Sequence, residues 1–363
     1  MRSEIPNNYP PIPLLSLALQ RIHETDPTAV PKARTIAKNM NTQLIDSYSL
    51  HHIEGLVKIP YSHISTDGLP DGMFAQKAHG QEHKFVFFPG VGGNLTDQIS
   101  TAFDIMTERI AQSQTQPIPP ADFYFIGHPT GPGGEISQNW LDGLRSNGLS
   151  QYNEAHADLL RHVLPQDTEG KNIFYYGTSM GTYAAIQASE MLTEWQGKNA
   201  NILKNPPGSY ERERSSLGEK LQLVVGYGIE NALRRIRQFA KNTKDLSQRD
   251  QEFLTSIAPI LKDRGISLEE DEEQRKLKRQ GRLEELLILA KKPVLPKTTT
   301  PTTIEQGVWD LISFSPKDAI RFMQGKRVTV YEYITHKLTP DNHSPEPYPD
   351  QMMHRMISAI ETI

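Results

Sequence analysis

The feature that most constrains the fold is the stretch 171–192, where an apolar run, closely spaced glycines and a series of small residues follow one another. Ile173–Tyr176 is β-branched and aromatic, which predicts a short buried strand. The next five residues, 177–181, fit the pattern G-x-S-x-G, in which glycines permit a tight turn that pushes Ser179 outward. Small and apolar residues then recur at helical spacing: Tyr183, Ala184, Ala185, Ala188 and Leu192. The stretch therefore predicts a strand, a sharp turn and a helix.

Strand and helix patterns alternate along much of the remaining chain. Strands are predicted at 56–64, 72–78, 85–88, 123–126, 200–204, 308–314 and 327–333, and helices at 30–48, 95–110, 152–163 and 351–363. Phe85–Phe88 is apolar at every position, as expected for an interior strand that helices cover on both faces. The predicted fold class is α/β, with a mostly parallel sheet.

A strand, a G-x-S-x-G turn and a helix in this order resemble the nucleophile elbow of the α/β-hydrolase family. The resemblance covers about residues 56–208 and 304–363. A chance occurrence of the five-residue pattern is the alternative, and the flanking strand and helix argue against it. The resemblance implies the α/β-hydrolase fold, with Ser179 as the nucleophile of an acyl-transfer reaction.

Residues outside the resemblance divide into two parts. Residues 1–55 predict an N-terminal helical extension, and residues 209–302 predict a charged helical cap inserted between the two parts of the core, 56–208 and 303–363. Apolar stripes of the cap, such as Leu283, Leu286, Leu287 and Ala290, are expected to pack over the mouth of the site. The tract 292–301 is rich in Pro and Thr and is expected to be a linker and hinge.

Composition excludes several classes of protein and site. The formal net charge of −4 gives no electrostatic reason to expect nucleic acid as a partner. Basic residues at Arg275, Lys276, Lys278 and Arg279 follow the acidic run 269–273, which suggests a solvated, self-neutralising helix face. The absence of cysteine excludes disulfides, thiolate metal sites and a Cys nucleophile.

Neither a signal peptide nor an apolar membrane span is seen, so the expected location is the cytoplasm, with signal-less export as the open alternative. No cofactor is expected, because Gly90-x-Gly92 lacks the third glycine of a dinucleotide fingerprint. No metal is expected either, because His79 and His83 flank a glycine rather than lie on a helix. The expected partner is a small acyl substrate.

Acyl transfer through Ser179 needs a base and an acid that orients it. The family order is Ser, then Asp or Glu, then His. By resemblance the base is His343, in a loop between the last predicted strand and the last helix, with His336 and His354 as poorer candidates. Asp318 is the expected acid and Asp341 the alternative. Asp318 is equally placed to begin a helix, with Ser315 as N-cap and Pro316 at the first position.

Two backbone N–H groups are expected to bind the oxyanion, because preorganised donors stabilise the charge that develops on the carbonyl oxygen. By resemblance, Met180 supplies one donor. The other is Val91, in a glycine loop, 89–93, that stands where the family has His-Gly-x-Gly-Gly, with Pro89 in place of the His. An ordinary tight turn is the alternative for this loop.

The sequence thus predicts a serine hydrolase that cleaves an ester, thioester or related acyl bond through Ser179, His343 and Asp318. An acyltransferase that uses the same Ser is one alternative. A non-catalytic binding protein with the same fold is another, because a fold does not fix a function.

Overall fold

The computed structural model describes eight stretches of the chain and six single residues: 27–65, 83–93, 121–164, 172–192, 198–207, 246–291, 295–307 and 334–339, with Leu19, His23, Glu24, Leu95, Gln98 and Val225. Several expectations lie outside the described residues. They are the strands at 72–78, 308–314 and 327–333, the helix at 351–363, most of the helix at 95–110 and nearly all of 209–245.

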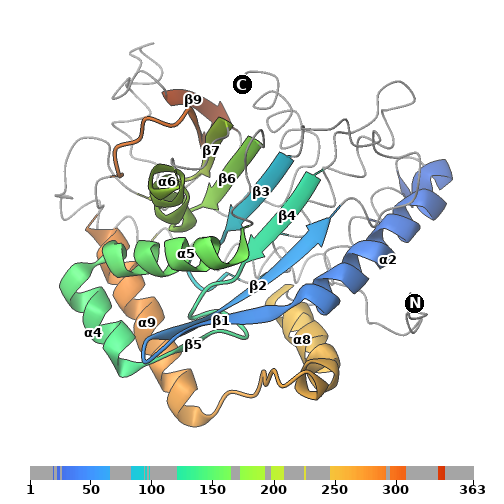
Figure 1. Cartoon of the computed structure of the whole chain (residues 1–363), viewed down its shortest axis with the longest axis horizontal. Helices are drawn as coiled ribbons and strands as arrows, with labels where there is room; N and C mark the ends of the chain where they lie inside the picture. The colour runs from blue at the N-terminus through green and yellow to red at the C-terminus, as the bar shows by residue number, and fades with distance from the viewer. Residues whose placement is uncertain are drawn as a thin grey trace.

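A mixed, mostly parallel sheet forms the centre of the molecule (Figure 1). Its main path runs β1-β2-β4-β3-β6-β7-β8-β9, and β5 pairs with β2. From β4 to β9 all neighbours along this path are parallel, whereas β2 is antiparallel to β1, β4 and β5. The strands are β1 Ser49–Ile53, β2 Val57–Ser65, β3 His83–Phe88, β4 Ala121–Ile126, β5 Glu135–Ile136, β6 Asn172–Thr178, β7 Lys198–Lys204, β8 Thr302–Gly307 and β9 Ile334–Thr339.

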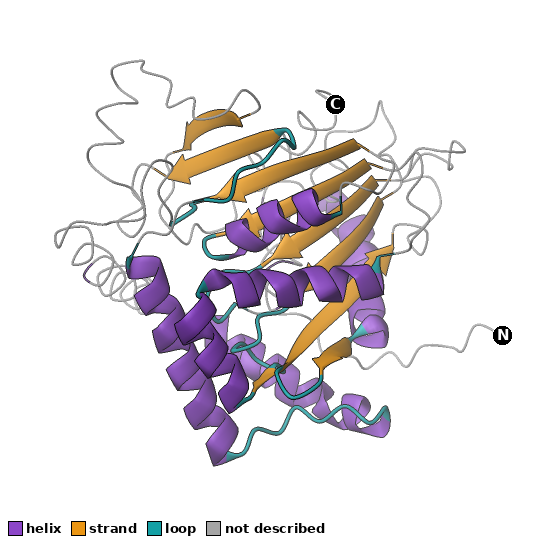
Figure 2. Cartoon of the chain, turned by 60° about the vertical axis from the view of Figure 1, so that its left-hand side comes forward, coloured by secondary structure: helices purple, strands orange, loops and turns teal. Residues whose placement is uncertain are grey.

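Helices cover both faces of this sheet, as Figure 2 shows. On one face the core includes α4, α5, α6 and the end of α9, and on the other it includes α2 and α8. The described helices are α2 Val30–Ser47, α4 Gln138–Asn147, α5 Leu149–Val163, α6 Gly181–Met191, α8 Leu246–Asp263 and α9 Glu272–Ala290, with a 3₁₀ turn at Pro27–Ala29. The predicted α/β class with a doubly covered sheet is confirmed.

Interior strands are apolar at successive positions because each face of the sheet contributes to a separate core. Phe85 and Phe87 of β3 join the core on the side of α2, and Val86 and Phe88 join the core on the side of α6. On the α2 side, Phe85 stacks between Phe123 and Phe174, with ring centroids 5.2 and 5.0 Å apart. These aromatic pairs align β4, β3 and β6, the three strands that carry the loops of the candidate site.

Helices α8 and α9 lie within the predicted cap, and part of the apolar stripe on α9 is exposed rather than buried. Leu283 and Leu287 of α9 are about half exposed, at 57% and 50%. The buried positions of α9 are Lys278, Gly281, Glu285 and Leu289. The expected burial is therefore wrong for Leu283 and Leu287, whereas Leu286 is partly buried and Ala290 packs against the core. The solvated assignment of Lys278 is also wrong, because this residue is 2% exposed. Arg275, Lys276 and Arg279 are exposed as predicted. Hydrogen bonds to the core, described below, select the polar face.

The Pro/Thr tract is anchored rather than loose over its second half. The Glu190 carboxylate at the end of α6 accepts hydrogen bonds from the Thr298 hydroxyl at 2.6 Å and from the Thr299 N–H at 2.8 Å. Thr298 and Thr300 are each only 5% exposed. The chain then enters β8 at Thr302, earlier than the strand predicted at 308–314. A distant carboxylate therefore binds residues 298–300, where the sequence predicts a hinge, and the hinge stays a prediction.

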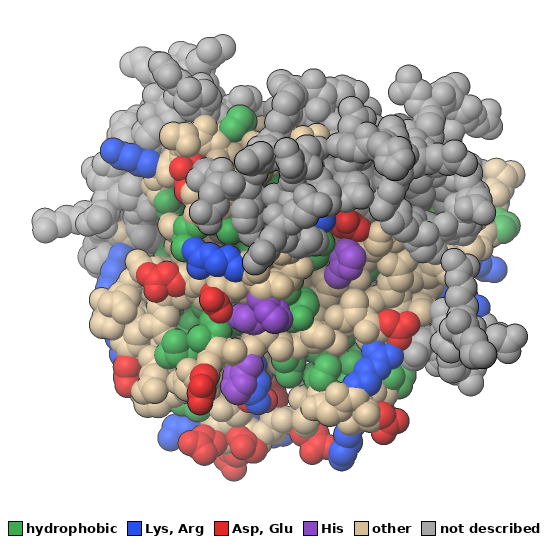
Figure 3. Space-filling model, in the orientation of Figure 1, with side chains coloured by type: hydrophobic (Ala, Val, Ile, Leu, Met, Phe, Trp, Pro, Cys, Tyr) green, Lys and Arg blue, Asp and Glu red, His purple; other side chains and the backbone are tan. Residues whose placement is uncertain are grey.

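Charged side chains of both signs are interspersed over the described residues on the face seen in Figure 3. Among the described helices, none combines the length and the apolar character that crossing a bilayer requires.

Candidate active site

Ser179 lies at the turn between β6 and α6, as the sequence predicts. The strand ends at Thr178 and the helix begins at Gly181. Ser179 has φ of +52°, in the left-handed region that non-glycine residues rarely occupy. Its N–H donates to the carbonyl of Lys204, 2.9 Å away at the end of β7, and its carbonyl accepts from the N–H and hydroxyl of Thr182 at 3.1 and 2.7 Å. These bonds hold the strained turn from both sides.

The two motif glycines are required by close backbone contacts. A Cβ on Gly177 would lie 2.5 Å from the carbonyl oxygen of Gly181, and a Cβ on Gly181 would lie 2.5 Å from that of Phe88. Neither contact could be relieved by a side-chain rotation, because each atom belongs to the backbone. The turn therefore places α6 directly against the end of β3. A strained serine between a parallel strand and a helix, flanked by obligatory glycines, has the geometry of a nucleophile elbow.

The chain has the α/β-hydrolase fold.

The glycine loop after β3 lies beside the elbow of this α/β-hydrolase fold. A Cβ on Gly90 would lie 3.2 Å from the Cβ of Ser179, so the loop passes against the serine. Gly93 donates its N–H to the Gly90 carbonyl at 3.0 Å, and Gly92 has φ of +65°, which closes the loop into a tight turn. Within the described part of the chain, the N–H groups of Val91 and Met180 donate to no backbone carbonyl in the turns and loops.

Comparisons with known proteins give a limited result. No protein-family model matches the chain, and no curated protein matches its sequence. A laboratory-evolved variant of a potato epoxide hydrolase is 11% identical, with a TM-score of 0.48 over 87% of this chain and 99% of that one. A bacterial membrane phospholipase A is 12% identical, with a TM-score of 0.47 over 96% and 97%. A peroxisomal α/β-hydrolase of Saccharomyces cerevisiae is 12% identical, with a TM-score of 0.45 over 87% and 84%. Likenesses of this degree carry no inference about the activity of this chain.

The expected base and acid lie outside the described residues. His343, Asp318, the alternative Asp341 and the weaker candidate His354 are all in this group. His336 is described, and it lies within β9 opposite Ile304 of β8 rather than in a loop. Ser179, Met180 and Val91 are therefore the predicted site residues whose surroundings are known.

Asn205 is a residue of this edge that the sequence analysis did not single out. It has φ of +50° and is fully buried, one residue beyond the end of β7. Asn is one of the few non-glycine residues that tolerate this conformation, so the Asn-Pro-Pro sequence at 205–207 was an available signal. It was interpreted only as the end of a strand.

A buried polar cluster lies next to the glycine loop and was also missed. His128 follows β4, and its Nε2 lies 3.7 Å from Oε2 of Glu285 on α9, with both side chains fully buried. Nδ1 of His128 accepts from the Thr130 N–H at 3.1 Å and lies 2.8 Å from the Thr130 hydroxyl. Because Nδ1 is an acceptor, the proton of neutral His128 is on Nε2. Tyr152 stacks on the His128 ring, with centroids 5.4 Å apart.

Burial shifts the pKa values of His128 and Glu285 in the directions that favour their uncharged forms. It lowers the pKa of His128 well below 6.5, with the positive charges of His156, Arg282 and Lys278 acting in the same direction. Burial also raises the pKa of Glu285 well above 4.5, although the Arg282 charge and a hydrogen bond with Thr130 oppose it. Both shifts favour the neutral forms, imidazole and carboxylic acid, over an ion pair. With Nδ1 bound to its own loop and Nε2 turned to Glu285, His128 has no ring nitrogen left to act as base for Ser179.

In the described part of the chain, no three His, Asp or Glu side chains come together in a way that could hold a metal ion.

Proposed function

We propose that this protein is a serine hydrolase that cleaves a carboxylic ester, thioester or related acyl bond, with Ser179 as nucleophile. The observation that carries the proposal is the left-handed backbone of Ser179 at the end of β6, with the glycine loop packed against its Cβ. Backbone strain of about 1–3 kcal/mol persists only where the surrounding structure maintains it, and such strain is concentrated at functional sites.

In the proposed cycle, Ser179 Oγ forms a bond to the acyl carbon while His343 takes the serine proton. The oxyanion is bound by the N–H groups of Val91 and Met180. The bond to the leaving group then breaks, the leaving group receives the proton from His343, and an acyl-enzyme remains. A water molecule, deprotonated by His343, attacks the acyl-enzyme and releases the acid and free Ser179.

The position of β9 supports His343 as the base. Strands β6 to β9 are parallel neighbours, so the chain leaves β9 at Thr339 on the same edge of the sheet as Ser179. Three strand spacings separate β6 from β9, which amounts to about 14 Å. His343 is four residues beyond Thr339, and four extended residues also span about 14 Å. The chain is therefore long enough to bring His343 to Ser179.

The acid in this proposal is Asp318, with Asp341 as the alternative. Asp318 follows the end of β8 by eleven residues, and β8 lies between β7 and β9 on the same edge. Asp341 is closer in sequence to β9, but it would have to turn back on His343. The same proposal keeps 209–302 as the inserted cap. Of the two described helices in this segment, α9 is the one that lies on the side of the candidate site. Helix α8 lies on the other face of the sheet, where Arg264 donates to the Ile45 carbonyl at 2.7 Å.

Activity-based labelling tests the nucleophile directly. The wild-type protein is expected to react with a fluorophosphonate and to hydrolyse at least one member of a panel of acyl esters of graded chain length. Ser179→Ala should lose both activities and remain folded, while Ser146→Ala, on the exposed face of α4, should retain both. Labelling of Ser179→Ala at the wild-type rate would contradict the assignment of the nucleophile.

A further inference from the structure

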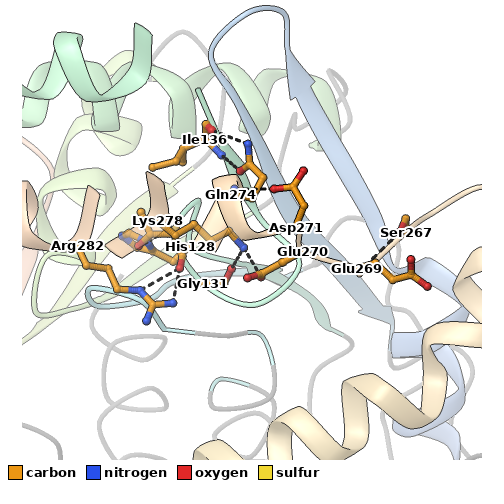
Figure 4. A network of polar contacts seen from close by, with 11 residues as sticks. His128, Gly131, Ile136, Ser267, Glu269, Glu270, Asp271, Gln274, Lys278 and Arg282 are labelled. Atoms are coloured by element: carbon orange, nitrogen blue, oxygen red, sulfur yellow. Dashed lines mark hydrogen bonds and ion pairs between the residues drawn. The ribbon is translucent and has the colours of Figure 1, made fainter. Parts of the chain in front are cut away.

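One face of α9 is hydrogen-bonded to β5 and to the loop between β4 and β5 (Figure 4). Gln274 exchanges two hydrogen bonds with the backbone of Ile136, at 3.2 and 3.1 Å. Lys278 Nζ donates to the Gly131 carbonyl at 2.9 Å. Arg282 donates from Nε and Nη2 to the Thr130 carbonyl at 3.1 and 2.5 Å. These residues are spaced four apart, so they form one line along the helix, one turn from each to the next.

The same face of α9 approaches the loop without space for larger residues. Gly281 lies between Lys278 and Arg282 on this face, and a Cβ there would come within 2.9 Å of Thr130 and 2.8 Å of Ile136. Glu285, one turn further, lies 3.5 Å from the Thr130 hydroxyl. The position of Thr130 and Gly131 is therefore fixed by α9 through backbone as well as side-chain contacts.

This loop in turn packs on the glycine loop beside Ser179. A Cβ on Gly131 would lie 2.5 Å from the carbonyl oxygen of Gly93, so the two backbones are in direct contact. Arg282 also reaches the glycine loop itself, because the Cβ position of Gly92 lies 3.2 Å from its Nε. Val91, the proposed oxyanion donor, precedes Gly92 directly. Arg282 therefore meets the glycine loop at Gly92 directly and at Gly93 through Thr130 and Gly131, one and two residues after Val91.

The charge of Arg282 is not neutralised by an acid in the described part of the chain. Both hydrogen bonds from its guanidinium go to the Thr130 carbonyl oxygen. Among the described residues, no carboxylate lies within ion-pair distance of that guanidinium. The acid one turn away, Glu285, lies buried against Thr130 and His128 instead. Within the described residues, an exposed guanidinium without a carboxylate partner therefore lies beside a loop that is proposed to bind a developing negative charge.

We propose that Arg282 is a positioning residue of the active site: it fixes the glycine loop through Thr130 and Gly92, and its charge favours the oxyanion bound at Val91. The catalytic part of this inference rests on the proposed function, whereas the effect on the loop does not. A displacement of catalytic groups by about 1 Å can cost up to a hundredfold in rate. Because Arg282 acts on a donor that matters most in the transition state, its loss should lower kcat more than it raises KM.

The test compares Arg282→Gln and Arg282→Lys with Arg279→Gln, an exposed arginine on the same helix. Hydrogen–deuterium exchange is measured on the full chain for peptides covering 89–93 and 172–192. Arg282→Gln should accelerate exchange at the Gly93 amide and leave 172–192 unchanged. Arg282→Lys should give a smaller effect, because one amine replaces a fork of two donors. Arg279→Gln should match the wild-type protein. Unchanged exchange at 89–93 in Arg282→Gln would overturn the inference.

Ester hydrolysis by the same variants supplies the second measurement. Arg282→Gln should lower kcat by roughly tenfold to a hundredfold with KM within about twofold, and Arg282→Lys should recover part of kcat. A rise in KM with unchanged kcat would overturn the positioning role. If the wild-type protein hydrolyses no ester and does not label at Ser179, the proposed function fails, and the exchange measurement still decides whether Arg282 fixes the loop.

Discussion

Ser179 and Asn205 take the same left-handed backbone conformation, with φ of +52° and +50°, one residue beyond the paired ends of β6 and β7. Thr178 and Lys204 are partners in the parallel register, and the Lys204 carbonyl accepts the Ser179 N–H. The backbone therefore leaves the sheet at the same register position after β6 and after β7. The Lys204 carbonyl that supports the elbow therefore belongs to the residue directly before the second left-handed position.

Replacement of Asn205 tests this relationship. Asn205→Gly should fold with greater stability than Asn205→Ala, by about 1 kcal/mol, because glycine has no Cβ to oppose the left-handed conformation. Both variants lose the same side chain, so their difference in urea unfolding isolates the backbone. Equal stability of the two variants would show that the turn after β7 does not require positive φ.

The raised pKa of the buried Glu285 carboxyl predicts how the stability of the fold depends on pH. Its folded pKa is raised above 4.5 by burial, so the folded protein keeps a proton that the unfolded chain releases above that pH. The resulting stability is complete below pH 4.5 and is lost as pH rises toward the folded pKa. Glu285→Gln keeps a neutral group of similar shape and removes this loss.

Unfolding by urea at a series of pH values therefore provides the measurement. Relative to the wild-type protein, Glu285→Gln should gain stability as pH rises from 4.5 to 8. His128 has the opposite dependence, because its lowered pKa costs stability as pH falls below 6.5, and it is present in both proteins. A difference between the two proteins that does not vary with pH would mean that Glu285 is ionised in the fold.

The hydrogen bonds that the Glu190 carboxylate accepts predict how readily a protease cuts the tract 295–301. Partial burial would raise its pKa, but hydrogen bonds from Thr298, Thr299 and Thr300 lower it below 4.5. The binding is therefore present above pH 4.5 and is lost as pH falls through the folded pKa. Glu190→Gln should be cut faster within this tract at neutral pH, while Glu154→Gln, exposed on α5, should be cut like the wild-type protein. Unchanged cleavage of Glu190→Gln would show that the carboxylate does not hold the tract.

The proposed base and acid are tested by substitution and pH. Activity of the wild-type protein should fall as pH drops through the ordinary titration range of histidine, about 6.5, because only neutral imidazole accepts the serine proton. His343→Gln should lose activity by orders of magnitude. Between Asp318→Asn and Asp341→Asn, the variant with the larger loss identifies the acid. Near-native turnover of His343→Gln would move the base to another His, with His336 and His354 the next variants to assay.

The sequence by itself determined those strands and helices whose formation depends on residues close together in the chain. Periodicity located β3, β4, β6, β7, α2 and most of α5, because alternating or helical burial is encoded within a few residues. The G-x-S-x-G pattern placed Ser179 at a turn, because the conformations and contacts that its glycines allow are local. Fold class and the candidate nucleophile followed from these patterns alone.

Only the tertiary structure decided which face of α9 is buried and what surrounds the glycine loop. A leucine pair on α9 indicated one face by hydrophobicity, but hydrogen bonds from Lys278 and Arg282 to carbonyls about 150 residues earlier selected the other. The neutral His128 and Glu285 pair and the anchoring of Thr298 by Glu190 depend likewise on partners far away in the chain. The desolvation of a buried polar group is offset only by a partner whose position the whole fold determines, and a local pattern does not contain that partner.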